Sequence, residues 1–279
     1  MPLVPLLRWT TSKLYHHTSS ANFVGDSDSL KARDDRSYRR SYDRAMAKVQ
    51  ALSNAVNRSP KINDTVKDVT GPTFINPTCT RWSSKFYAVQ CVVSVGLGKV
   101  KLCQTALKQE AMTEADMEFL TSYANTMKPL VLAMNQLQAE TRTYLGHLIP
   151  TIKGVLCKLS LSTDKAVEPL VSALPDGINR RFQAVLSDKE HMIASVLHPQ
   201  FTLHFLPEDV RLQTKRQVLA YVQQVADESQ VCTTSVSESV EGDPKEDDDD
   251  LYSFKFMNTT IRDGNAASSP ISKELDDFL

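Results

Sequence analysis

Side chains that commonly carry metal or acid–base chemistry are scattered along this sequence of 279 residues. Its 6 histidines and 5 cysteines show no Cys-x2-Cys or His-x3-His spacing, which zinc sites usually require. The stretch "GLGK" at 96–99 lacks the flanking glycine, the Ser or Thr and the strand of a phosphate-binding loop, and indicates the end of a helix. Asp34 and Asp35 have no apolar flanks that could shape a pocket. We therefore predict no catalytic residue, no metal ligand, no cofactor and no small-molecule substrate.

Positive charge is concentrated in "KARDDRSYRRSYDR", residues 31–44, where six Lys and Arg stand against three Asp, a local balance of +3. The whole chain has a net charge of −1, so any attraction to nucleic acid must be local. Arg39 and Arg40, interleaved with Tyr38 and Tyr42, are candidate contacts to a phosphate backbone. A helix face of mixed charge explains the same pattern equally well.

The cysteine pattern and the hydropathy indicate a soluble intracellular protein. An odd number of cysteines without close pairs is typical of free thiols in a reducing compartment. The opening "MPLVPLLRW" contains two prolines and no basic leader, which argues against a signal peptide. No run approaches the roughly 18 apolar residues that a membrane span needs, so we expect no membrane association.

Apolar residues recur at helical spacing along most of the chain, whereas no run of comparable strength has the alternation of a strand. The sequence therefore predicts a mainly α protein, a helical bundle with disordered termini. The expected helices cover 37–58, 82–95, 113–134, 145–159, 167–185, a short segment that begins near Ser187 and ends before "LHPQF", and 210–228.

Local signals refine these boundaries. Thr113 with Asp116, and Ser187 with Glu190, have the spacing of capping boxes at helix starts. The stretch "DVTGPTFINPTCT", residues 68–80, contains a glycine and two prolines and should be a connector. Pro129 and Pro150 lie within apolar stripes, and each should bend or break its helix because proline lacks the backbone donor.

Three regions follow from these patterns. Residues 1–36 lack a sustained period and are expected to be irregular, and residues 37–228 form the helical domain. Residues 229–279 form an acidic tail, in which "EGDPKEDDDD" carries seven acids and one lysine. Too few apolar residues remain there to offset the entropy of ordering, so we expect disorder.

Four segments together resemble one known family. "TRWSSKFYAV" resembles the Thr-Arg-Trp-Asn-Ser hallmark of hAT-superfamily transposases and of the BED-zinc-finger proteins derived from them, with Ser83 in place of the asparagine. "YDRAMAKVQALSNAVNRS", "SYANTMKPLVLAMNQLQAETRTYLGHLIPTIKGVLCKL" and "RRFQAVLSDKEHMIASVLHPQFTLHFL" are similar, in the same order, to the family's helical insertion and its surroundings. The resemblance covers about residues 17–230.

The resemblance implies that residues 37–228 correspond to the helical insertion of a ribonuclease-H-like transposase and that residues 1–36 are a remnant of its core. The chain contains neither the family's zinc finger nor its catalytic carboxylates, so the implied protein is non-catalytic, a domesticated transposon product in the nucleus with residual DNA binding. Trp82 is the position that matches a tryptophan near DNA ends in the family, and Arg81 beside it could meet a phosphate. The alternative is that Trp82 packs the insertion onto the core.

Two other interpretations stay open. The helices could form a protein–protein interaction module whose acidic tail tunes association and solubility. The chain could also be an inactive fragment of a longer BED-zinc-finger hAT protein, with a homologous full-length chain as a partner. Salt dependence separates DNA binding from docking of a partner helix, because only phosphate contacts weaken steeply with salt.

Overall fold

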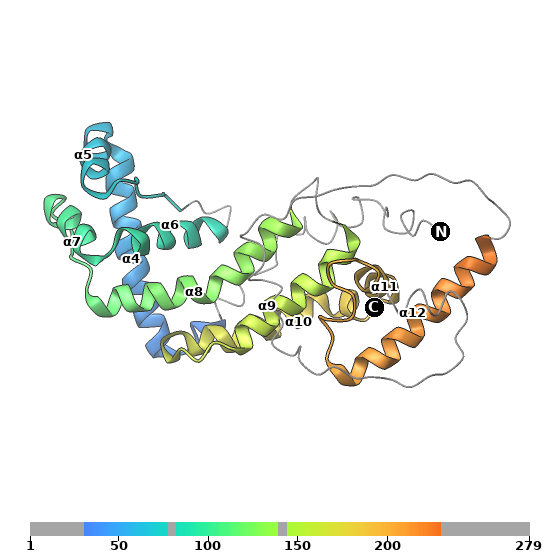
Figure 1. The fold of residues 1–279 in the computed structure, drawn as a ribbon. Coiled ribbons are helices and arrows are strands. Elements are labelled where there is room, and N and C mark those ends of the chain that lie inside the picture. Colours follow the sequence, from blue (N-terminus) through green and yellow to red (C-terminus); the bar gives the residue numbers. More distant parts are fainter. Residues whose placement is uncertain (1–30, 78–81, 139–143, 230–279) are drawn as a thin grey trace. The chain divides into compact units, whose positions relative to one another are not determined.

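A computed structural model describes residues 31–77, 82–138 and 144–229 (Figure 1). Over these ranges the chain is helical and contains no strand, which confirms the mainly α class. Of the ends that were expected to be irregular or disordered, residues 1–36 and 229–279, the parts 1–30 and 230–279 lie outside the described residues.

The described α-helices are α4 (Arg36–Arg58), α5 (Pro60–Thr70), α6 (Trp82–Val95), α7 (Leu97–Ala106), α8 (Glu114–Leu137), α9 (Leu148–Ser160), α10 (Glu168–Leu186), α11 (Lys189–Val196) and α12 (Glu208–Ser229). Two 3₁₀ turns, η1 (Leu145–His147) and η2 (Lys165–Val167), precede α9 and α10. The chain forms two compact units. Within the described residues, unit 1 takes 135–138, 144–157 and 182–229, and unit 2 takes 31–77, 82–134 and 158–181.

Unit 2 is organised around α4. Asp35 caps this helix by accepting a hydrogen bond from the Tyr38 amide at 2.7 Å. The inward face of α4 buries Ala45, Val49, Leu52 and Val56 at helical spacing, and each buried Leu or Val contributes about 1.5–3 kcal/mol. α4 packs against α5 and α6, and both of these pack against α7.

Aromatic side chains join α4 to α8 in the same unit. Tyr38 lies 5.7 Å from Phe119 between ring centroids, and Tyr42 lies 5.9 Å from Tyr123. Tyr38 is buried and its hydroxyl has no hydrogen-bond partner in the described structure. Burial raises the pKa of this phenol. The α4–α8 contact therefore fixes the side of α4 that faces solvent.

Unit 1 contains a close approach between η1 and α11. A Cβ placed on Gly146 would lie 2.5 Å from the carbonyl oxygen of Ala194, so only glycine fits there without a shift of the backbone. Leu145 and Ala194 are buried together at the same contact. The imidazole Nδ1 of His147 accepts a hydrogen bond from the Tyr144 amide at 3.2 Å, which closes the η1 turn.

Most predicted helices are confirmed, but two were missed. Pro60 occupies the first position of α5, where a proline needs no amide hydrogen, so the residue that was expected to end one helix begins another. Residues 68–70 of the expected connector therefore belong to α5. Gly96 has a φ of 82° and separates α6 from α7, so "GLG" interrupts the helix and does not end the helical segment.

The cap and proline predictions had mixed outcomes. Thr113 and Asp116 form the expected capping box, because each side chain accepts the other residue's amide hydrogen at 3.1 Å. The N-cap of α11 is Asp188, so the capping box predicted at Ser187 is wrong. α8 continues through Pro129, whereas Pro150 lies in the first turn of α9, which proline tolerates.

Across the three described ranges, no single helix is long and apolar enough to span a membrane. Ser83–Val95 and Leu97–Ala106 meet the length and composition test only as a pair, and this pair is bent by 101°.

Candidate nucleic-acid interface

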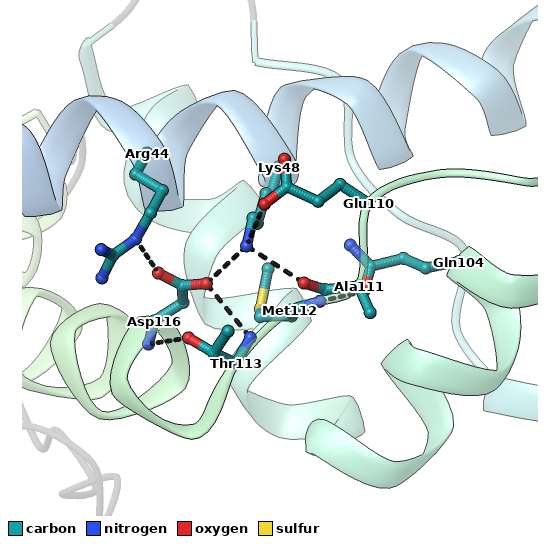
Figure 2. A network of polar contacts seen from close by, with 8 residues as sticks. All are labelled: Arg44, Lys48, Gln104, Glu110, Ala111, Met112, Thr113 and Asp116. Carbon is teal, nitrogen blue, oxygen red and sulfur yellow. Dashed lines mark hydrogen bonds and ion pairs between the residues drawn. The ribbon is translucent and has the colours of Figure 1, made fainter.

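A buried carboxylate organises the polar chemistry of unit 2. The Asp116 side chain is 0% exposed and lies beneath two cations of α4 (Figure 2). Its Oδ1 accepts a hydrogen bond from Arg44 Nε at 2.6 Å, and its Oδ2 accepts one from Lys48 Nζ at 2.8 Å. The Thr113 amide donates to Oδ2 as well. Three hydrogen bonds thus hold the Asp116 carboxylate, and two of them tie the start of α8 to the middle of α4.

The Lys48 ammonium likewise has a partner for each of its hydrogen-bond donors. It contacts Asp116, the carboxylate of Glu110 at 2.9 Å and the carbonyl oxygen of Ala111 at 3.0 Å, which matches its three donors. The set of Arg44, Lys48, Glu110 and Asp116 contains two cations and two anions and is neutral overall. Such compensation is what a buried charge requires.

The pKa shifts of the two buried groups follow from these contacts. Burial alone would raise the pKa of Asp116, but the hydrogen bonds from Lys48, Thr113 and Arg44 outweigh it and hold the pKa below its ordinary value. Burial alone would lower the pKa of Lys48, but its hydrogen bonds to Asp116 and Glu110 outweigh this effect and raise the pKa. Both groups are therefore charged at neutral pH.

The solvent face of α4 carries a row of arginines. Arg36, Arg40 and Arg44 are four residues apart, so they lie on one side of the helix and span about 12 Å along its axis. All three are exposed, and the Arg44 side chain is 45% exposed although Asp116 holds it. Arg36 and Arg40 form no ion pair with any described residue. We call these three residues the arginine row.

The other cations of the basic segment form ion pairs with aspartates of the same chain. Lys31 Nζ lies 3.6 Å from Asp176 Oδ2, and Arg39 Nε lies 3.7 Å from Asp43 Oδ2. Arg33 pairs with the same Asp43 carboxylate. Of the two predicted contacts in this segment, Arg40 has no ion-pair partner among the described residues, whereas Arg39 pairs with Asp43.

The structure limits what the neighbouring aromatic residues can do. Tyr38 is buried, and Tyr42 packs against Phe119 and Tyr123. The tyrosines that alternate with arginines in the sequence are thus part of the α4–α8 contact and are not placed to stack on bases. The arginine row offers charge and hydrogen-bond donors, which suit phosphates.

The motif that carried the family resemblance is described only in part. Arg81 lies outside the described residues, and Trp82 is the first residue of α6. Whether Trp82 packs or contacts DNA stays a prediction.

Unit 1 holds a second cluster of titratable side chains. His147 and His198 have ring centroids 4.4 Å apart, and Tyr144 and Phe201 flank His147 at 5.8 and 5.3 Å. Burial, together with the nearby His198, lowers the pKa of His147 to about 4, and burial also lowers the pKa of His198. The ranges that the structure covers contain no group of three His, Cys, Asp or Glu placed to hold a metal ion.

Sequence reasoning missed two members of the arginine row and the network beneath it. Arg36 and Arg44 were available from the four-residue spacing with Arg40, because that spacing places them on one helix face. The partnership of Lys48 with Asp116 joins residues 68 positions apart, and no local pattern indicates it.

Comparison of the chain with models of protein families, with curated proteins and with solved structures finds no match. The resemblance to hAT transposases is therefore carried by the sequence segments alone.

Proposed function

We propose that this chain is a non-catalytic, hAT-transposase-derived helical protein that binds DNA in the nucleus by contacting its phosphate backbone. The observation that supports this best is the arginine row, in which Arg36 and Arg40 are exposed and have no carboxylate partner among the described residues. Arginine suits this role because its planar guanidinium can donate two parallel hydrogen bonds to a phosphate. The proposal assigns no catalytic step to the chain, because the sequence lacks metal-ligand and nucleophile–base spacings.

Backbone binding of this kind is independent of base sequence. The contacts come from side chains on one helix face, and the aromatic side chains beside them pack inward. Phosphate contacts position a protein on a duplex without reading its bases. We therefore expect similar affinity for duplexes of different sequence.

The test compares two double variants of the full chain on a short fluorescent duplex at low salt. Arg36→Gln/Arg40→Gln should weaken binding by about tenfold or more, because two phosphate contacts are lost. Lys61→Gln/Lys99→Gln removes the same charge from exposed positions on α5 and α7 and should weaken binding far less. Equal losses in both variants, or binding to anionic lipid vesicles without binding to the duplex, would contradict the proposal.

A second candidate function is docking of a protein partner. It is favoured by large apolar side chains at the surface of each unit: Leu102 on α7 is 65% exposed and Leu212 on α12 is 56% exposed. Apolar docking is insensitive to salt, so salt dependence separates it from phosphate binding.

A further inference from the structure

Arg44 differs from the other two members of the arginine row because its guanidinium is already fixed. Only Nε contacts Asp116, at 2.6 Å, and the terminal amino groups of Arg44 have no partner in the described part of the chain. The side chain is nevertheless almost half exposed. One edge of the guanidinium thus points to a buried carboxylate, while other donors remain available (Figure 2).

The anchor of Arg44 is itself rigidly held. Asp116 accepts hydrogen bonds from Lys48 and the Thr113 amide, and Lys48 is fixed in turn by Glu110 and the Ala111 carbonyl. A side chain that is held in its binding conformation loses less entropy when it binds a ligand than a freely rotating one. A lysine at the same position could not do this, because its three donors lie on one nitrogen and it has no planar fork to direct at a phosphate while another edge contacts Asp116.

We propose that Asp116 is a positioning residue, which holds Arg44 by Nε so that the terminal amino groups of Arg44 form a third phosphate-binding position in line with Arg36 and Arg40. This inference rests on the proposed function and adds that the members of the arginine row bind phosphate in different ways. Arg36 and Arg40 provide mobile charge, and Arg44 provides a preorganised contact. The ligand is the phosphate backbone of a nucleic acid.

The positioning role and simple electrostatics predict opposite changes in DNA affinity for the substitution Asp116→Asn. Asp116→Asn removes a negative charge beside Arg44, so electrostatics alone would strengthen binding to DNA. Loss of the carboxylate also releases Arg44 from its fixed orientation, and under the proposal this weakens binding by about fivefold although the net charge rises by one unit. Circular dichroism at the assay temperature checks that the variant is folded.

Arg44→Lys tests the same point at an exposed position, where folding is not at risk. The substitution keeps the charge, so the slope of log affinity against log salt concentration should barely change. Affinity itself should fall by about fivefold, because lysine lacks the two terminal amino groups that Asp116 holds in place on Arg44. Arg40→Lys makes the same change at a member of the row that is not anchored, and it should lose less affinity than Arg44→Lys.

The outcomes separate the two proposals. A larger loss of affinity in Arg44→Lys than in Arg40→Lys supports the positioning role. Wild-type affinity in Arg44→Lys, equal losses in the two variants, or tighter binding by folded Asp116→Asn overturns it and leaves the proposed function standing. Absence of DNA binding by the wild-type chain overturns both.

Discussion

At the scale of residues, Asp116 is the buried carboxylate that the polar side chains of unit 2 contact. A carboxylate removed from water costs several kcal/mol unless its charge and hydrogen bonds are compensated. Arg44, Lys48 and the Thr113 amide supply that compensation. Because the pKa of Asp116 in the folded chain lies below the unfolded value of about 3.9, this contribution to stability is present above that pH and is lost as the pH falls below it.

His147 gives unit 1 a different pH dependence. Its pKa falls from 6.5 to about 4 on folding, so protonation favours the unfolded chain. Stability from this group is complete above about pH 6.5 and is lost as the pH falls toward 4, an effect of up to about 3 kcal/mol. His198 acts in the same direction, and His191, which pairs with the N-cap residue Asp188, lies on α11, which packs against η1.

We expect His147→Phe to reduce this pH dependence, because phenylalanine keeps an aromatic ring beside Phe201 but cannot be protonated. The measurement is the melting temperature of the full chain between pH 7.5 and pH 4.5, roughly the window of the pKa shift. The wild-type melting temperature should fall more steeply than that of the variant. Parallel curves would show that His147 does not carry the effect.

At the scale of elements, the sequence predicts the long helices and misses the junctions. α8 and α10 were predictable because their apolar residues recur over many turns. α5 was missed because Pro60 can equally end one helix or occupy the first position of the next. The cap of α11 was assigned to Ser187 because Ser187 and Glu190 have the spacing of a capping box, but Asp188, which is also a favoured N-cap residue type, occupies that position.

The same limit applies to the candidate site. Arg39 and Arg40 were predicted from local charge, but local charge does not show which cations pair within the protein. Arg39 shares Asp43 with Arg33, and Arg44 is held by a residue 72 positions away. Composition therefore finds the basic segment, whereas ion pairs to Asp43 on α4, to Asp116 on α8 and to Asp176 on α10 leave Arg36 and Arg40 available.

The contact between η1 and α11 provides a test at this scale. Gly146→Ala should destabilise the protein by several kcal/mol or shift η1 away from α11, because the added methyl group would meet a backbone carbonyl that cannot rotate aside. Chemical denaturation of the full chain measures the effect.

Gly98→Ala is the matched control. Gly98 lies inside α7, and a Cβ there has open space around it, so alanine should be neutral or stabilise α7 by up to about 1 kcal/mol. If the two variants have the same stability, the close approach of η1 to α11 is not a constraint on the fold.

At the scale of the whole molecule, the positive charge that matters is local. The chain carries a net charge of −1, so it has no general attraction to DNA, and binding depends on the few cations that internal carboxylates do not neutralise. Arg36 and Arg40 meet this condition, because they are unpaired in the described structure, whereas the charge of Arg44 is compensated by Asp116 and only its terminal amino groups remain available. Few contacts imply weak binding that depends on ionic strength.

The slope of log affinity against log salt concentration, measured for the full chain on a DNA duplex, tests this account most directly. Three phosphate contacts predict a slope of about −2.7, and Arg36→Gln/Arg40→Gln should bring it to about −0.9. A wild-type slope near zero, or the same slope in the double variant, would contradict the account.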